Sequence, residues 1–340
     1  MTTVTHIGID LAKTYFHVFC ADERGQAVIQ KRIHRSDLME FMATVSVSTI
    51  AMEACGSAHH WARQFEKLGH DVKLIHPGFV KPFVKGNKND SNDAEGIYEA
   101  SVRPRMRFVP VKTVEQQDIL AIHRTREILI RQRTQLVNQI RGLLAERGHV
   151  APQGRRSLMK LITELLSDEG VLTPIFEELL TEMKERLVSL DERRLIYDRK
   201  LRKLSQENET CKRLTEIPGI GPICSTALYA TVGKGRDFKN GREMAAWLGL
   251  VPRQETTGGK PKLLGISKRG DRYLRKQLIH GARSMQWNPK GLPEARRLWL
   301  ANLESRRHKN VAAVALANKQ ARIAWALLST GQTYRTQQVA

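Results

Sequence analysis

Hydrophobic and polar positions alternate in short runs along the first 112 residues of the chain. Three such runs, VTHIGID, YFHVFCA and AVIQKRI, follow one another with a turn at DERG, which predicts an antiparallel meander. The pattern then switches between helix and strand in the order SDLMEFMATV, STIAME, AHHWARQFEKLG and DVKLIHP. Because this alternation favours parallel pairing of the later strands, we expect an α/β domain with an RNase H-like opening.

Beyond this domain, hydrophobic residues recur at the spacing typical of long helices. Residues 113–148 carry hydrophobic side chains at helical spacing without proline, and a second helical stretch covers roughly residues 173–208. Two long charged helices form either a hairpin within one chain or a coiled coil between chains, and leucine periodicity does not decide between them. The chain is thus expected to comprise an α/β domain at 1–112, a helical coiled-coil region at 113–208 and a mainly α-helical domain at 209–340.

The charge of the chain indicates a polyanionic partner. Its 340 residues contain 56 Lys and Arg against 35 Asp and Glu, which gives a formal net charge of +21. The excess is concentrated at the C-terminal end, where residues 251–340 hold 18 Lys and Arg against 4 Asp and Glu. Such a surface binds phosphates in a salt-dependent way, so nucleic acid is the expected partner.

Four carboxylates stand out against this positive background. Asp10 closes the run HIGID, Glu53 closes STIAME, and Asp90 and Asp93 lie three apart in NDSND, where a helix begins. Strand ends and a helix start can direct acidic side chains into one cleft, and clustered carboxylates hold the hard cations, Mg²⁺ or Mn²⁺, that assist phosphoryl transfer. For either member of the pair alone, capping of the helix is the simpler interpretation.

Glycine and proline mark a second motif. IPGIGP precedes the helical run ICSTALYAT, so Gly219 and Gly221 are expected to form the turn of a helix-hairpin-helix whose backbone N–H groups hold a phosphate. The alternative is an ordinary turn between helices.

Other features narrow the class of protein. The four cysteines are too scattered for a disulfide framework, and the five tryptophans lie in helical hydrophobic patterns that predict core positions. No run approaches the roughly 20 apolar residues of a membrane span, and no apolar leader precedes the first strand pattern. We therefore expect a cytoplasmic protein without membrane contact.

Several motifs in a fixed order carry a resemblance to a known family. GIDLAK, MEACGS, NKNDSNDAEGIYEA, IPGIG, WLGLVPRQ, TTGGK and ISKRGDRYLR together resemble the DEDD transposases of the insertion-sequence 110 and 1111 type, relatives of the pilin-gene invertase. The resemblance covers nearly the whole chain. It implies a RuvC-like N-terminal domain, a coiled coil and a C-terminal transposase domain in a bacterial, nucleoid-associated recombinase. It also implies recombination guided by a bridge RNA, in a dimer that assembles into a tetramer.

The resemblance also assigns roles to residues. Asp10, Glu53, Asp90 and Asp93 match the family's four acidic positions. The family's serine nucleophile corresponds to Thr257 in TTGGK, a departure that leaves Thr256, Ser267 or a weakened enzyme as alternatives. The basic residues expected to contact phosphates are Arg253, Lys260, Lys262, Lys268, Arg269, Arg272 and Arg275. Two other functions remain open: a junction-resolving nuclease that uses water as its nucleophile, and a non-catalytic nucleic-acid binder.

Overall fold

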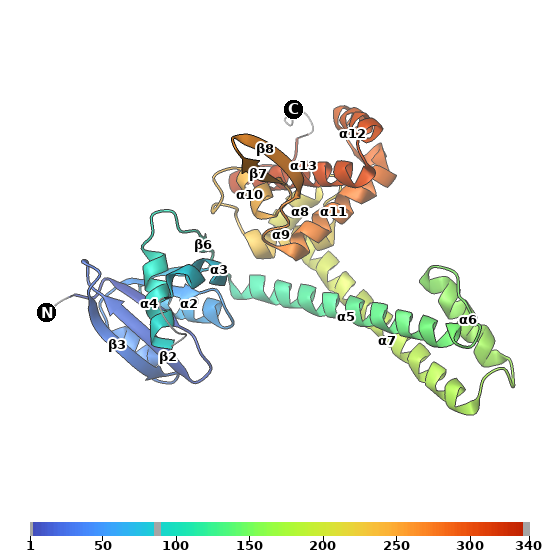
Figure 1. The fold of residues 1–340 in the computed structure, drawn as a ribbon, viewed down its shortest axis with the longest axis horizontal. Coiled ribbons are helices and arrows are strands. Elements are labelled where there is room, and N and C mark those ends of the chain that lie inside the picture. Colours follow the sequence, from blue (N-terminus) through green and yellow to red (C-terminus); the bar gives the residue numbers. More distant parts are fainter. Residues whose placement is uncertain (1–2, 85–89, 336–340) are drawn as a thin grey trace. The chain divides into compact units, whose positions relative to one another are not determined.

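A computed structural model describes residues 3–84 and 90–335 of the chain, and the side chains of residues 90 and 91 are also outside the description. The chain divides into two compact units, Met1–Val114 and Glu115–Ala340. The first unit contains the mixed sheet, and the second is mainly helical (Figure 1). None of the helices in the described residues combines the length and apolar character needed to cross a membrane.

The first unit is built on a six-stranded sheet of order β3-β2-β1-β4-β5-β6. Its strands are β1 (His6–Asp10), β2 (Tyr15–Ala21), β3 (Ala27–His34), β4 (Thr49–Glu53), β5 (Asp71–Ile75) and β6 (Phe108–Val109). The first three strands form an antiparallel meander, β4 and β5 continue in parallel from β1, and β6 closes the sheet antiparallel to β5. This arrangement confirms the expected meander and parallel strands.

Helices cover both faces of the sheet. Alternate residues of β1 and β4, such as Ile7 and Met52, pack with α1 (Leu38–Thr44) and α2 (Ala58–Lys67) in one hydrophobic core. On the opposite face, Ala51 and Phe19 pack against α4 (Asp90–Ser101). The short elements α3 (Pro77–Val80) and η1 (Lys81–Phe83) precede α4. Because side chains alternate between faces with a period of two, the strand ends present specific residues to α4.

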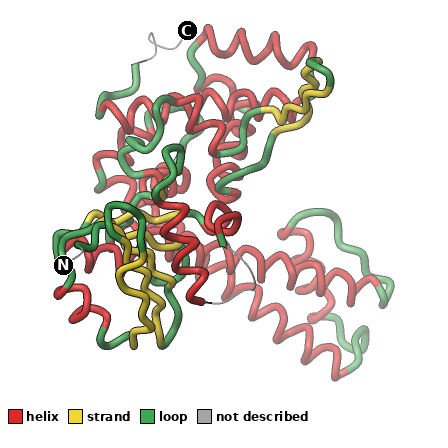
Figure 2. The backbone as a smooth tube through the Cα atoms, turned by 60° about the vertical axis from the view of Figure 1, so that its left-hand side comes forward, coloured by secondary structure: helices red, strands yellow, loops and turns green. Residues whose placement is uncertain are grey.

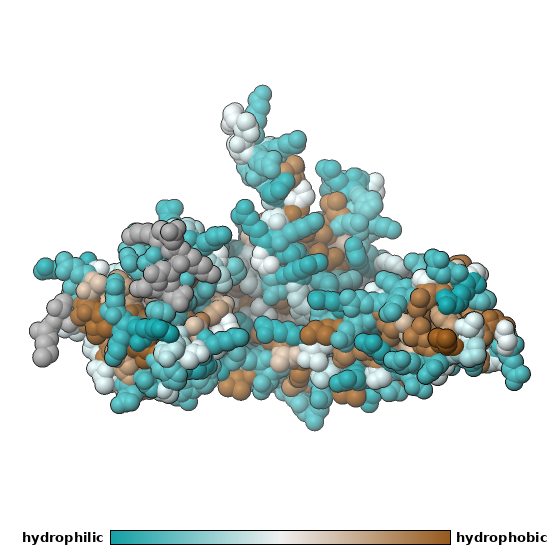
Figure 3. Space-filling view, turned by 60° about the horizontal axis from the view of Figure 1, so that its bottom comes forward, coloured by the Kyte–Doolittle hydropathy of each residue, from teal (hydrophilic) through white to brown (hydrophobic). Residues whose placement is uncertain are grey.

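The second unit begins with a helical arm. In the arm, α5 (Val114–Ala145) packs against α7 (Pro174–Glu207) through one hydrophobic core that also includes α6 (Arg155–Ser167). The two long helices therefore pair within one chain, as in the hairpin alternative. The sequence analysis did not predict α6. Figure 3 shows hydrophobic side chains gathered at the outer end of the arm, where Val150 and Ile175 are 79% and 81% exposed.

The rest of the second unit is a helical domain with one hairpin. Its elements are α8 (Glu209–Thr215), α9 (Pro222–Val232), α10 (Gly241–Trp247), β7 (Pro252–Thr257), β8 (Lys260–Ile266), α11 (Arg272–Trp287), η2 (Pro289–Gly291), α12 (Glu294–Arg306) and α13 (Lys309–Thr330). The helices share one core, to which α9, α11 and α13 contribute most of their buried residues. The strands β7 and β8 form an exposed hairpin that extends from the helices (Figure 2).

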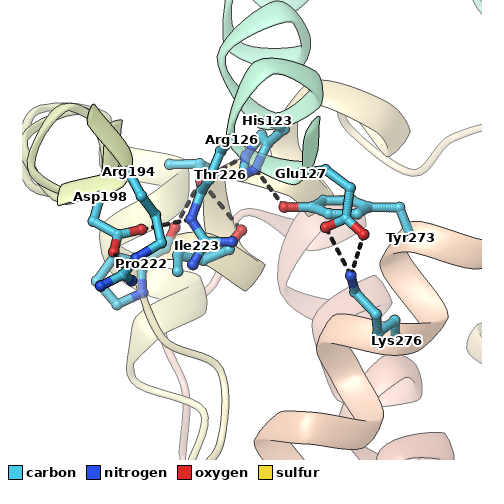
Figure 4. A network of polar contacts seen from close by, with 10 residues as sticks. All are labelled: His123, Arg126, Glu127, Arg194, Asp198, Pro222, Ile223, Thr226, Tyr273 and Lys276. Atoms are coloured by element: carbon cyan, nitrogen blue, oxygen red, sulfur yellow. Dashed lines mark hydrogen bonds and ion pairs between the residues drawn. The ribbon is translucent and has the colours of Figure 1, made fainter. Parts of the chain in front are cut away.

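A buried polar network joins the arm to this domain (Figure 4). The His123 ring on α5 lies with Nδ1 2.9 Å from the Tyr273 hydroxyl on α11 and Nε2 3.1 Å from Thr226 Oγ1 on α9. The Thr226 hydroxyl donates its only proton to the Pro222 carbonyl, so Nε2–H must donate to Thr226 while Nδ1 accepts from Tyr273. Burial, reinforced by the nearby Arg126 guanidinium, lowers the pKa of His123 to about 4. The network thus requires a neutral imidazole.

Candidate active site

Two of the predicted carboxylates lie side by side at strand ends. Asp10 is the last residue of β1 and Glu53 the last residue of β4. The parallel register pairs Ile9 with Met52, so Asp10 and Glu53 follow as neighbours one position further along. Both lie on the face of the sheet that α4 covers, because the alternate residues Gly8 and Ala51 also face α4.

The helix α4 runs antiparallel to β1, which brings its first turn over these strand ends. A Cβ placed on Gly8 would come within 2.3 Å of the Ala94 carbonyl oxygen, and the ring of His6, two residues earlier, lies 6.3 Å from that of Tyr98, one helical turn later. His6 thus lies beside Tyr98, Gly8 lies beside Ala94, and Asp10 lies towards the N-terminus of α4. Gly8 is required here because any side chain would push the helix away.

The remaining two predicted ligands are on this first turn. Asp93 is half-buried within α4, and Asp90 begins the helix, with its side chain outside the described residues. Among the side chains that the structure describes, no three His, Cys, Asp or Glu groups lie close enough to hold a metal ion. The strand-end carboxylates are adjacent hard oxygen donors, which suits a divalent cation such as Mg²⁺.

The thiol of Cys55 reports the negative charge at this end of the sheet. Burial raises its pKa, and the charges of Glu53 and Asp10 raise it further. Both carboxylates therefore act on the same half-buried side chain. Their combined field is what a cation bound at the strand ends would neutralise.

One residue at this end was missed by the sequence analysis. His17 of β2 is the direct antiparallel partner of Asp10, and it lies on the same face as Phe19, which packs against α4. The antiparallel meander predicted from the sequence would place some residue of YFHVFCA opposite Asp10. The register that selects His17 depends on the turn between the strands, which the hydrophobic pattern does not specify.

The predicted nucleophile lies on the hairpin of the second unit. Thr257 is the last residue of β7 and pairs with Lys260 across a two-residue turn. The turn residues Gly258 and Gly259 have φ angles of +56° and +74°, the left-handed conformations that a tight hairpin turn requires. Thr256 pairs with Pro261, and its Oγ1 accepts a hydrogen bond from Gln254 at 3.2 Å. Both threonines are exposed.

Ser267, the third candidate hydroxyl, is placed differently. Its backbone N–H donates to the Val251 carbonyl at 2.8 Å, which fixes the end of β8. Its Oγ atom is buried. A hydroxyl in this position cannot reach a phosphate without a rearrangement of the loop, so the exposed threonines are better placed to attack.

The predicted phosphate-binding residues fall into two groups. Six are exposed on the hairpin, the loop after it or the start of α11: Arg253, Lys260, Lys262, Lys268, Arg269 and Arg272. Arg275 is only 8% exposed, and its Nη1 donates to the carbonyls of Leu248 and Arg269 at 2.9 and 2.8 Å. Its guanidinium connects the end of α10 to the loop before α11, so Arg275 is a structural residue and not a phosphate ligand.

The glycines of IPGIGP also have distinct surroundings. Gly219 has a φ of +90°, and a Cβ there would come within 2.2 Å of Gln320 Nε2 and 2.9 Å of the Gly281 carbonyl oxygen. Close packing of the turn against α11 and α13 therefore requires this glycine. Gly221, in contrast, is exposed and is the N-cap of α9. The predicted phosphate contact remains a prediction for the backbone at Gly221.

Comparison with known proteins identifies close relatives of the chain. A family model described as "Transposase", of the DEDD IS110 type, matches residues 7–147, and one described as "Transposase IS116/IS110/IS902 family" matches residues 211–298. The chain is 47% identical to the probable family 20 transposase of Pseudomonas aeruginosa, over 98% of this chain and 99% of that protein.

Two further relatives have similar coverage. The chain is 43% identical to the transposase for insertion sequence element IS1111A of Coxiella burnetii, over 98% of this chain and 92% of the relative. It is 42% identical to the transposase for insertion sequence element IS1328 of Yersinia enterocolitica, over 98% and 99% of the two chains. These similarities extend through both units.

Proposed function

From the premise that the chain belongs to the Transposase IS116/IS110/IS902 family of insertion-sequence transposases, we propose how it cuts and exchanges DNA strands. Four carboxylates hold a divalent metal, Mg²⁺ or Mn²⁺, and one hydroxyl attacks the scissile phosphate. The carboxylates are those of Asp10, Glu53, Asp90 and Asp93, and the hydroxyl is that of Thr257.

The observation that carries this proposal is the convergence at the strand ends. Asp10 and Glu53 terminate adjacent parallel strands on one face, and the first turn of α4 lies over them. The sheet order, with an antiparallel meander followed by parallel strands, supports an RNase H-like, RuvC-like fold for residues 1–112. When bound, the metal supplies Lewis-acid stabilisation of the negative charge that develops on the phosphate.

Attack by a protein hydroxyl keeps the phosphate in a diester, because each phosphorus–oxygen bond that breaks is replaced by a new one. Thr257 Oγ1 forms a bond to phosphorus while the bond from phosphorus to a sugar oxygen breaks, the hydroxyl gives up its proton, and the departing oxygen takes one up. Attack by a second strand then reverses the sequence, so no high-energy cofactor is consumed. The ammonium of Lys260, across the hairpin from Thr257, adds positive charge beside the attacked phosphate.

The partners follow from the charge distribution and from the family. DNA ends and target DNA bind the basic surface of residues 209–340, and an element-encoded bridge RNA, the structured guide RNA, binds the same protein. The arm at 113–208 contributes to a dimer that assembles into a tetramer. The exposed hydrophobic residues at the outer end of the arm support such an assembly.

An excision assay on the element's own ends tests the proposal. Asp10→Asn should abolish strand cleavage and leave nucleic-acid binding largely unchanged, because it removes a negative charge that attracts the metal and preserves the shape of the side chain. Glu23→Gln is the matched control, since it neutralises an exposed carboxylate in the turn between β2 and β3. Cleavage by Asp10→Asn at the wild-type rate would refute the metal site.

Threonine at the family's serine position favours two alternatives. In a junction-resolving nuclease, water takes the place of the side-chain nucleophile, and in a weakened relative, only nucleic-acid binding remains. Replacement of both Thr256 and Thr257 by alanine separates these functions. The nuclease would still cut, the binder would show no magnesium-dependent cleavage even as wild type, and the recombinase would lose its covalent protein–DNA adduct.

A further inference from the structure

One tryptophan departs from the predicted core positions. Trp287, the last residue of α11, is 90% exposed, whereas Trp61 is 5% exposed. Trp247, Trp299 and Trp325 are packed against the core of the second unit. Single exposed apolar side chains are ordinary on protein surfaces, so the support and the surroundings of Trp287 decide whether its ring has a binding role.

The position of Trp287 follows from the helical period. The buried face of α11 contains Leu274, Leu278 and Ala282, and continuation of this spacing reaches Met285. Trp287 lies two residues further, which turns it by about 200° from Met285 to the other side of the helix. The sequence analysis predicted a core position for Trp287 because it lies in a helical apolar segment, and did not consider which face of the helix it occupies.

The end of α11 is held firmly, so Trp287 is not on a frayed terminus. Gln286 Nε2 donates to Glu304 Oε1 at 2.7 Å and to the Lys309 carbonyl at 3.0 Å. Arg283, one turn earlier, donates to Asn310 Oδ1 at 3.2 Å. These bonds tie the last turn of α11 to the end of α12 and to the start of α13. The exposed ring is thus presented from a rigid support.

The surroundings of Trp287 are basic. From Arg283 to Lys309 the chain holds seven Lys and Arg against two Glu. Of these, Arg283, Lys290 and Lys309 are exposed and lie on or next to the segments joined at the end of α11. A rigid aromatic face within a positive field is the arrangement by which proteins bind unpaired nucleotides.

The same turn of α11 adjoins the predicted phosphate-binding turn. A Cβ on Gly219 would come within 3.1 Å of Met285 Cγ, so IPGIGP and the last turn of α11 are in direct contact. Because Trp287 lies on the other side of α11 from Met285, this contact fixes the end of the helix and leaves the indole facing away from the IPGIGP turn.

We propose that Trp287 is a stacking platform for an unpaired base of single-stranded DNA. The proposal rests on the proposed function only in that strand exchange on DNA must separate base pairs. Stacking on a protein aromatic contributes about 1–3 kcal/mol per base and tolerates any base, because each has a π face. The platform therefore serves to hold a separated strand without reading its sequence.

Fluorescence anisotropy with the full-length protein and a labelled oligothymidylate tests this proposal at one fixed salt concentration. Trp287→Ala should weaken binding about 5- to 150-fold, the ratio that corresponds to the loss of one stacked base. Trp287→Phe should retain most of the affinity, because its ring still stacks. A strand with the same backbone but abasic residues should bind wild type and Trp287→Ala equally well. Leu298→Ala, which removes an exposed apolar side chain from α12, is the matched control and should bind like wild type.

Four outcomes would overturn the proposal. Trp287→Ala could bind oligothymidylate as well as wild type does, or it could lose affinity for the abasic strand to the same extent. It could lose affinity for oligouridylate alone, which would assign the indole to RNA. It could change the sedimentation coefficient without a change in DNA affinity, which would assign the indole to a second copy of the chain. A failure of the metal site is distinguishable, because Asp10→Asn affects cleavage and leaves oligothymidylate binding intact.

Discussion

Mild acid should loosen the junction between the arm and the C-terminal helices through the protonation of His123. The ring is 2% exposed and bonded on both nitrogens, and a proton on Nδ1 would face the Tyr273 hydroxyl, which now donates to that atom. Burial and the Arg126 guanidinium hold the pKa of His123 near 4, below the ordinary value of 6.5. The unfolded chain therefore binds the proton more tightly than the folded chain does.

The sign and size of the effect follow from this difference in pKa. Stability from neutral His123 is fully present above pH 6.5 and is lost as the pH falls from there towards 4, because the unfolded state binds more protons in this window. At pH 5 the imidazole is almost fully protonated in the unfolded chain and about one-tenth protonated in the folded chain. Relative to pH 7, this difference lowers the free energy of unfolding by about 2 kcal/mol.

Urea unfolding at pH 7 and pH 5, followed by tryptophan fluorescence, measures this difference. Four of the five tryptophans belong to the second unit, so the signal reports mainly on the affected part. His123→Gln cannot titrate and should be less stable at pH 7 but show a smaller loss on acidification. His149→Gln, a substitution at the outer end of the arm, is the control and should keep the wild-type dependence on pH.

An unchanged difference between the two pH values in His123→Gln would refute this reasoning. The acid sensitivity would then come from other groups, and the polar network would not require a neutral ring. An unfolding slope that changes between pH 7 and pH 5 would show instead that the transition is not two-state, and hydrogen exchange of α5 amides would replace it as the measure.

Two further substitutions test the packing of α4 on β1 and the ion pairs at the junction between the arm and the C-terminal helices. Gly8→Ala should lower the free energy of unfolding by about 1–3 kcal/mol and abolish excision, because its Cβ would collide with the Ala94 carbonyl. Gly142→Ala, with open space around it in α5, should instead be neutral or stabilising by up to about 1 kcal/mol, and equal thermal shifts for both would contradict the account. Asp198→Asn should cost about 3 kcal/mol in urea unfolding, because it leaves the buried Arg126 and the half-buried Arg194 without their carboxylate. Glu164→Gln breaks only an exposed pair on α6 and should cost less than about 0.5 kcal/mol, so similar losses for the two would count against a special role of the junction.

The elements that the sequence predicted best are those with a buried face. In strands such as HIGID and TIAME, every second residue is hydrophobic because it packs on α1 and α2. In α5 and α7, hydrophobic residues recur at helical spacing because the two helices pack on each other. The mixed sheet of the first unit and the largely helical second unit were predicted from these patterns. The acidic strand ends were also visible, since Asp10 and Glu53 interrupt apolar runs at the positions where the strands end.

The elements that the sequence analysis missed lack this signal. Both strands of the β7–β8 hairpin are almost entirely exposed, so no hydrophobic alternation marks them. The one sequence signal of the hairpin, the Gly258–Gly259 pair at its two-residue turn, was not used in the sequence analysis. The helix α6 follows a break rich in glycine and proline, which drew attention to the loop. His17 depends on strand register and Trp287 on helical phase, two properties that a shift of one or two residues reverses.

The measurement that tests the central claim most directly is the mapping of the covalent protein–DNA linkage. Trypsin cleaves after Arg253 and Lys262 but not readily between Lys260 and Pro261, so one peptide, residues 254–262, contains both hairpin threonines. After reaction with the element's ends and nuclease trimming, mass spectrometry should find a nucleotide on Thr257 in the wild-type protein and none in Asp10→Asn. Strand cleavage without any nucleotide on this peptide would contradict the account and assign the attack to water or to another residue.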